Sequence, residues 1–185
     1  MSWESIHENE ATIADQASKY NVALEWGKEY AETVGVIISL FAIVEDYPSA
    51  LLVKITEMDS SDAMSILSTF RAFSNRLDLL KEVARNRPEG SVGRICLSYY
   101  RGIMSEANKI RNKYAHAKYS YAKTHFVLET YASDTNRNAE QLEMTLKDFQ
   151  ADRDRLKRII CELHAFCYRD EIPLGLHKQL SQPTP

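Results

Sequence analysis

Cysteine is scarce in this sequence, and the residues that bind structural metals are not clustered. The three cysteines are odd in number and show no Cys-x2-Cys spacing, so neither a disulfide framework nor a zinc site is indicated. A glycine-rich phosphate loop, paired carboxylates suited to catalysis and an internal repeat are also missing. We therefore expect a protein of a reducing cytoplasm that uses no metal and no other cofactor.

The sequence also lacks a long apolar run and a secretory leader. It does not open with a charged segment followed by an apolar stretch and a small-residue cleavage site. Its most apolar run, Val34 to Val44, is shorter than the ~20 residues that a membrane-spanning helix needs, and predicts a buried helix instead. With 44% apolar and 26% charged residues in a chain of 185, the composition is that of one soluble globular domain.

Apolar residues recur every three or four positions along most of the chain, which predicts an all-α protein. Pro48 and the turn Pro88-Glu89-Gly90 separate helical stretches, and Thr145 to Asp148 has the form of a capping box. The helices that we expect are Lys28 to Asp46, Ala50 to Thr56, one long helix from the capping residues at 59–62 to Asn86, Val92 to Tyr114, and a last helix opened by Thr145.

The segment after His116 has a different character. Aromatic and β-branched residues follow a partial period of two, which predicts a short β-hairpin or another ordered excursion. Its aromatic residues either stack on nucleic-acid bases or pack the excursion against the helices. We expect Ser133 to Glu140 to be a polar link. The aromatic residues in question are Tyr119, Tyr121, Phe126 and Tyr131.

We divide the chain into three segments. Residues 1–27 are polar and acidic with few apolar residues, so we expect an N-terminal segment that docks loosely. Residues 28–169 form the helical domain. Residues 170–185 include Pro173, Gly175 and the final Gln-Pro-Thr-Pro, which predict a flexible C-terminal tail.

The net charge of −3 is distributed unevenly along the chain. From Ser68 to Thr124 there are 12 Lys and Arg against 4 Asp and Glu, a net charge of +8, whereas Met1 to Tyr47 carries 2 against 9, a net charge of −7. A local positive field can attract a polyanion such as RNA whatever the total charge. The alternative is a charged face that is simply solvated.

One stretch of the basic third, Ile110-Arg111-Asn112-Lys113-Tyr114-Ala115-His116, combines a permanent cation, an amide and an imidazole within two helical turns. Histidine can transfer a proton near neutral pH, and the planar fork of arginine matches phosphate oxygens and can stabilise charge that grows on a phosphoryl group. Together they suit metal-independent cleavage of RNA by its own 2′-hydroxyl, with Asn112 orienting the imidazole or the phosphate. The candidate RNA-binding residues are Lys109, Lys113 and Lys118.

Helix geometry sets a condition on this site. Asn112 and His116 lie one turn apart, and Lys109 and Lys113 fall on the same arc. Arg111 projects about 140° from His116 in an ideal helix, so the two converge only if the helix ends or distorts near Ala115, or if the arginine side chain curls round. The alternative is that both residues merely cap the C-terminus of the helix, where cations are favoured.

An arginine, a polar residue beside it and a histidine five positions after the arginine, at the end of a long helix in a small all-helical protein, resemble the Arg-x4-His motif of the HEPN superfamily. The resemblance implies a bundle of about four to five helices, a homodimer formed through the motif helices, and an endoribonuclease site built from both copies. It implies Arg111 as phosphate stabiliser, Asn112 as its polar partner and His116 as acid or base. It also suggests a toxin or defence role.

The chain departs from this family at one position. In the HEPN toxins of MNT/HEPN pairs, the nucleotidyltransferase modifies a tyrosine two residues after the histidine, where this chain has Lys118, followed by Tyr119. The departure weakens the suggestion that an antitoxin or nucleotidyltransferase protein is a partner. Bundles of this family can also lose activity and keep the fold. A non-catalytic dimer that binds RNA or a protein is therefore one alternative, and a purely structural interaction protein is another.

Overall fold

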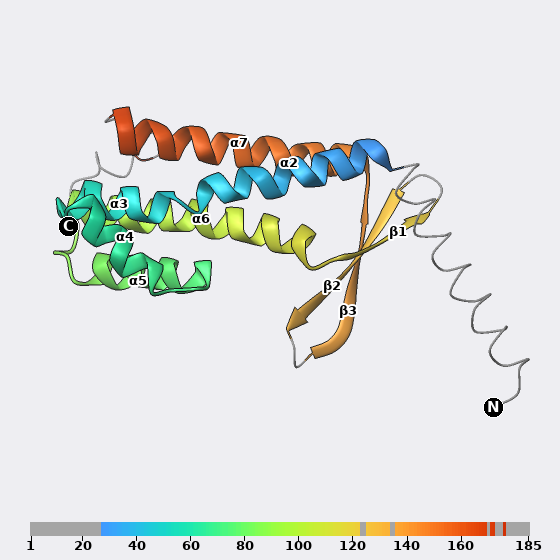
Figure 1. The fold of residues 1–185 in the computed structure, drawn as a ribbon, viewed down its shortest axis with the longest axis horizontal. Helices are drawn as coiled ribbons and strands as arrows, with labels where there is room; N and C mark the ends of the chain where they lie inside the picture. The colour runs from blue at the N-terminus through green and yellow to red at the C-terminus, as the bar shows by residue number, and fades with distance from the viewer. Residues whose placement is uncertain (1–26, 123–124, 134–135, 170, 173–175, 177–185) are drawn as a thin grey trace, which may run out of the picture.

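The computed structural model of the protein describes residues 27–122, 125–133, 136–169, 171–172 and 176 (Figure 1). These residues form a helical bundle and one three-stranded sheet, which confirms the expected all-α bundle with a β excursion after the motif helix. The expected N-terminal segment lies outside the described residues, except for Gly27. The elements are α2 (Lys28–Val44), α3 (Tyr47–Thr56), α4 (Ser60–Ser68), α5 (Phe73–Arg85), α6 (Val92–Ala115), β1 (Lys118–Ala122), β2 (His125–Ser133), β3 (Asn136–Met144) and α7 (Leu146–Arg169).

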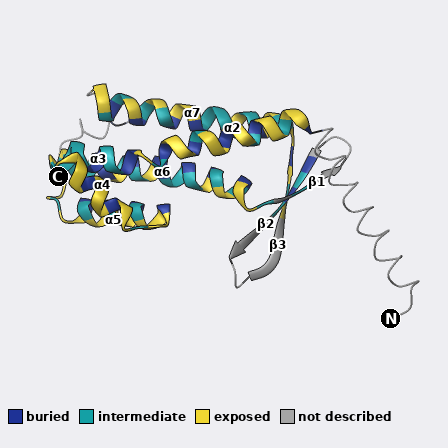
Figure 2. Ribbon diagram, in the orientation of Figure 1, coloured by how far each residue is buried: buried dark blue, intermediate teal, exposed yellow. Residues whose placement is uncertain are grey.

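The bundle is organised around α6, the helix that carries the motif. Helices α2 and α7 run side by side along α6, and α5 packs against it from the opposite side (Figure 1). The inward faces of these helices meet in one hydrophobic core (Figure 2), and burying a Leu, Ile or Phe side chain contributes about 1.5–3 kcal/mol relative to leaving it exposed. The residues that α6 buries recur at helical spacing: Cys96, Leu97, Tyr100, Ile103, Met104, Ala107, Ile110 and Tyr114.

The apolar helical stretch near the start of the described chain is longer than the run Val34 to Val44. Helix α3 follows α2 after only Glu45 and Asp46, and Lys28–Thr56 is long and apolar enough, by length and composition alone, to cross a membrane. In this fold the inner face of α2 packs in the bundle core. The core helix of a soluble protein passes the same test of length and composition.

The single long helix expected between residues 59 and 86 is wrong, because the chain forms two helices there. The hydroxyl of Thr69 donates a hydrogen bond to the main-chain carbonyl of Ile66, at 2.6 Å, and so competes with the helical hydrogen-bond pattern. The main-chain carbonyl of Phe70 accepts a hydrogen bond from Arg76 Nε, at 3.1 Å. Apolar periodicity did not reveal the break, since Phe73 returns to the core directly after it.

The β excursion is an antiparallel sheet in the order β1-β2-β3, one strand larger than the expected hairpin. The prediction of a polar link over Ser133 to Glu140 is wrong, because β2 runs to Ser133 and β3 begins at Asn136. Ladder hydrogen bonds join main-chain groups, so a polar sequence can form a strand when a partner strand is in place.

Two residues of β2 connect the sheet to the bundle. Phe126 and Leu128 are both buried. The centroid of the Phe126 ring lies 4.2 Å from that of Tyr30 on α2 and 6.1 Å from that of Phe149 on α7. Phe126 therefore packs the excursion against the helices and is not available for base stacking. The side chains of Tyr121 and Tyr131 lie outside the described part of the chain.

The start of α7 shows one of the two hydrogen bonds of a capping box, at the residues that the sequence predicts. The main-chain N–H and the hydroxyl of Thr145 both donate to Asp148 Oδ2, each at 2.7 Å. Where the structure describes the segment expected to be a flexible tail, it is partly docked. Ile172 packs against the core and Leu176 is fully buried.

Candidate functional site

The motif helix α6 begins at a capped end and stops at the candidate site. The hydroxyl of its N-cap residue, Ser91, accepts a hydrogen bond from the main-chain N–H of Arg94 at 3.4 Å. At the other end the last helical residue is Ala115, and His116 takes φ −117° and ψ 1°, outside the helical region. The helix therefore ends where the convergence of Arg111 and His116 requires it to end.

The three predicted catalytic residues lie together at this helix end. Arg111 Nη1 donates a hydrogen bond to Asn112 Oδ1 at 2.9 Å and lies 3.3 Å from His116 Nε2. A guanidinium group cannot accept a hydrogen bond, so the second contact is a hydrogen bond only when Nε2 is unprotonated. The contact sets an imidazole nitrogen beside a permanent positive charge, at a place open to solvent.

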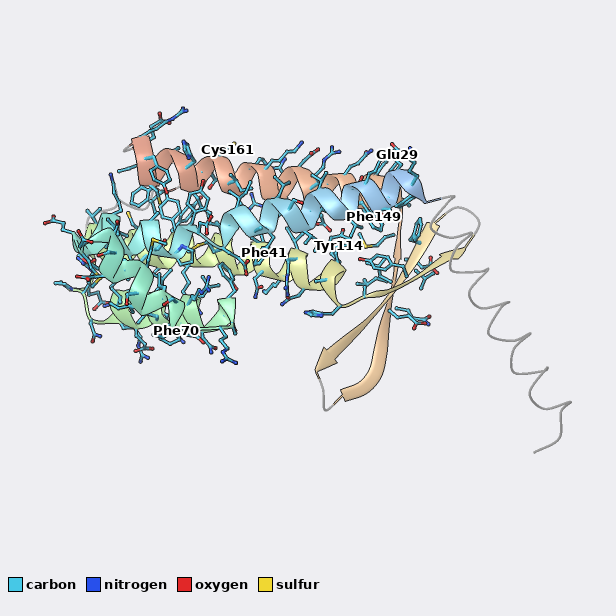
Figure 3. All side chains as sticks on the ribbon, viewed as in Figure 1. Glu29, Phe41, Phe70, Tyr114, Phe149 and Cys161 are labelled. Atoms are coloured by element: carbon cyan, nitrogen blue, oxygen red, sulfur yellow. The ribbon has the colours of Figure 1, made fainter. Side chains whose placement is uncertain are left out.

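Arg111 is also placed by its contact with α2. Its guanidinium carbon lies 5.7 Å from the centroid of the Phe41 ring, a distance typical of a cation–π interaction. Phe41 belongs to the buried face of α2 (Figure 3). Because every hydrogen bond of Arg111 within the described chain goes to a side chain, the residue does not cap the main-chain carbonyls of α6.

Two tyrosines fix the end of α6. The hydroxyl of Tyr119 on β1 donates to the main-chain carbonyl of Tyr114 at 2.6 Å, and the hydroxyl of Tyr114 donates to Asp152 Oδ2 on α7 at 2.5 Å. Burial raises the pKa of Tyr119 to about 12. Burial, together with the hydrogen bond to Asp152, also raises the pKa of Tyr114. Both hydroxyls therefore stay protonated near neutral pH and act as donors that hold the helix end.

The three candidate RNA-binding lysines are in different surroundings. Lys113 forms an ion pair with Asp152, and its ammonium group lies 5.3 Å from the centroid of the Tyr114 ring. This ion pair joins α6 to α7, and RNA binding by Lys113 stays a prediction. Lys109 is exposed on α6. Lys118 is the first residue of β1, and its side chain lies outside the described part of the chain.

The exposed stripe of α6 that leads to His116 is made of small and polar residues. Gly102 lies at its middle, and a Cβ atom built there would have nothing within 4 Å. Large apolar side chains do not occur on this stripe, so another helix could approach it closely. The stripe residues are the exposed Ser98, Gly102, Lys109 and Asn112 and the half-buried Ser105.

A hollow of about 250 Å³ opens beside Arg111 and Asn112. No pattern in the sequence predicts this hollow, because most of the other residues that line it come from the end of α2 and the start of α5, which are distant from Arg111 in the chain. Its polar lining residues are Glu45, Arg71, Ser74, Asn108, Arg111 and Asn112. Among the described residues, no group of three or more His, Cys, Asp or Glu side chains could hold a metal ion.

Comparisons with family models, with curated proteins and with solved structures found no match to this chain.

Proposed function

We propose that this protein is a metal-independent endoribonuclease of the HEPN type, which cleaves RNA by attack of the 2′-hydroxyl at a site formed across a homodimer. The observation that carries the proposal is the contact between Arg111 Nη1 and His116 Nε2, at 3.3 Å, with Asn112 bound to the same nitrogen of the arginine. His116 can transfer a proton and Arg111 can bind phosphate, and both side chains lie within reach of one phosphodiester.

The reaction needs no bound metal to balance. The 2′-oxygen of the RNA bonds to the adjacent phosphorus, and its proton passes to an unprotonated imidazole nitrogen. The bond from phosphorus to the 5′-oxygen breaks, and that oxygen takes a proton from an acid. The products are a 2′,3′-cyclic phosphate and a free 5′-hydroxyl. Arg111 stabilises the charge that develops on the phosphoryl oxygens.

A second copy of the chain supplies the missing proton donor. One imidazole can act as base or as acid at a given moment, and each protomer has one His116. His116 of a second copy, brought close by pairing of two α6 helices, completes the acid–base pair. The small residues around Gly102 favour that pairing, because a glycine without neighbours lets two helices approach closely.

The charge of the surrounding segment favours RNA as the substrate. The segment from Ser68 to Thr124, which contains the site, carries a net charge of +8 in a protein whose total charge is −3. A toxin or defence role is part of the proposal only through the resemblance to HEPN proteins.

The test is the chemistry of the cut. A labelled single-stranded RNA is incubated with the protein in a buffer with a metal chelator, and the ends of the products are identified. Cleavage that leaves a cyclic phosphate, and that stops when the 2′-hydroxyl at the cut site is methylated, is the expected result. Cleavage of the methylated RNA would contradict the proposal. Binding without cleavage would favour the non-catalytic RNA-binding dimer.

A further inference from the structure

The hollow beside Arg111 is positioned to extend the candidate site. It lies between the end of α2, the first turn of α5 and the last turns of α6. Phe41 and Phe73 contribute its apolar part, and their rings pack against each other with centroids 5.1 Å apart. Because these two rings belong to the buried core, the walls of the hollow are held in place by the fold.

The hollow has more hydrogen-bond donors than the fold uses. Arg71 is exposed and makes no hydrogen bond or ion pair within the described chain. Arg111 uses Nη1 for Asn112 and His116, so its Nε and Nη2 groups remain available. The hydroxyl of Ser74 and the amide of Asn108 complete the polar lining.

Helix α5 adds a partial positive charge. Its N-cap residue is Ala72, whose side chain cannot accept a hydrogen bond, and no other side chain caps the helix. The N–H groups of the first turn of a helix carry partial positive charge and favour an anion nearby. One lining group opposes an anion, the carboxylate of Glu45 at the end of α2.

We propose that this hollow binds a phosphate of single-stranded RNA next to the phosphate that is cut. The inference rests on the proposed function, because Arg111 borders both places and would contact two phosphates of one strand. The volume of about 250 Å³ lies below the roughly 300–1,000 Å³ of small-molecule sites, so it suits a phosphate group of a chain that continues outside. The RNA then runs from His116 across α6 toward Arg71.

The test compares three single substitutions in the full-length protein, in a His116→Ala background that separates binding from cleavage. Arg71→Ala should raise the dissociation constant for a single-stranded RNA roughly three- to tenfold at low salt, and should reduce the slope of log affinity against log salt by about 0.7. Glu45→Gln should tighten binding, because it removes the opposing carboxylate. A variant that had lost its fold would not bind RNA more tightly, so this result cannot come from unfolding.

Arg85→Ala is the matched control. Arg85 is exposed and lies at the other end of α5, about 18 Å along the helix axis from Phe73, so its removal changes the net charge equally without touching the hollow. Equal effects of Arg71→Ala and Arg85→Ala would overturn the inference, and so would the absence of RNA binding at low salt. Cleavage by the protein with His116 intact is measured in parallel and reports on the proposed function separately. If the protein binds RNA without cutting it, the RNA affinities of the three variants still show whether the hollow binds RNA.

Discussion

The hydroxyl of Tyr119 donates a hydrogen bond to the main-chain carbonyl of Tyr114, 2.6 Å away. This bond joins the second residue of β1 to the last turn of α6, and His116 lies between the two. The carbonyl belongs to a helix end, where main-chain acceptors lack helical partners. The sheet thereby fixes the direction in which the chain leaves the helix, and with it the position of the imidazole beside Arg111.

Tyr119→Phe should therefore act through His116. We expect a loss of about 1 kcal/mol in the free energy of unfolding, the usual contribution of one hydrogen bond, and a fall in kcat with little change in KM. Tyr99→Phe is the matched control, since its hydroxyl donates to Glu162 on α7, at 2.9 Å, away from the site. Steady-state kinetics and urea unfolding of both variants are the measurements. An equal effect of both substitutions on kcat would show that Tyr119 does not position the histidine.

We expect Lys109 to contribute to RNA binding and Lys113 to contribute to the stability of the fold. Lys109→Ala should weaken RNA binding and reduce its salt dependence, because the side chain is exposed on the basic face of α6. Lys113→Ala should instead lower the free energy of unfolding, because Asp152 loses its cationic partner while Tyr114 still donates to it. Binding titrations at several salt concentrations and urea unfolding distinguish the two. A larger loss of RNA affinity in Lys113→Ala would contradict this assignment.

Stability should fall in acid partly through the ion pair that joins α6 to α7. Arg155 donates to both carboxylate oxygens of Glu106, each at 2.7 Å, and this hydrogen bonding lowers the pKa of Glu106. A lowered pKa in the folded state means that the contribution is complete above the ordinary glutamate value of 4.5 and is lost as the pH falls through the lower folded value.

Glu106→Gln measures that contribution. The variant should be less stable than the wild type by about 0.5–1 kcal/mol at pH 7, as is usual for a partly exposed pair, and the difference should shrink below about pH 4.5. Urea unfolding at pH 7, 5 and 3 provides the values. Glu82→Gln, which breaks an exposed pair within α5, serves as the control and should cost less. A wild-type advantage that is as large at pH 3 as at pH 7 would contradict this interpretation.

A substitution at Gly102 tests whether the exposed stripe of α6 forms the dimer interface. Gly102→Gln places a bulky neutral side chain on the exposed stripe of α6, where nothing in the protomer obstructs it. The protomer should become more stable by roughly 0.5–1 kcal/mol, while the dimer dissociation constant should rise about tenfold or more because the added side chain overpacks the seam. Gly35→Gln on α2 is the control, since that glycine is equally open. Analytical ultracentrifugation gives the dimer dissociation constant of each variant. Dissociation caused only by Gly35→Gln would place the seam on α2.

The helices that carry the core could be predicted from the sequence because their apolar spacing is regular. The apolar periodicity predicted the bounds of α2 and α6 to within about two residues, and the capping residues Thr145 and Asp148 predicted the start of α7. The break between α4 and α5 could not be predicted in this way. It depends on the hydrogen bond of Thr69 and on Arg76 reaching Phe70, while apolar spacing continues on both sides.

The contact between Arg111 and His116 could be anticipated from the sequence, but the surroundings of the two residues could not. Sequence spacing selected Arg111 and His116 and stated that they converge only if the helix ends near Ala115. Whether it ends there is decided by contacts with the sheet. The pairing of Lys113 with Asp152 and the hollow lined by Glu45 and Arg71 arise from residues far apart in the chain, and no local pattern encodes such contacts.

The most direct test of the central claim is the rate of RNA cleavage by His116→Ala, measured beside its RNA affinity in chelating buffer. We predict a rate about 10²–10⁴-fold below the wild type, with nearly unchanged affinity. Arg111→Ala should lose a comparable rate and some affinity, and Arg111→Lys should not restore the rate, because a point charge does not reproduce the planar fork. Cleavage by His116→Ala at the wild-type rate would contradict the account.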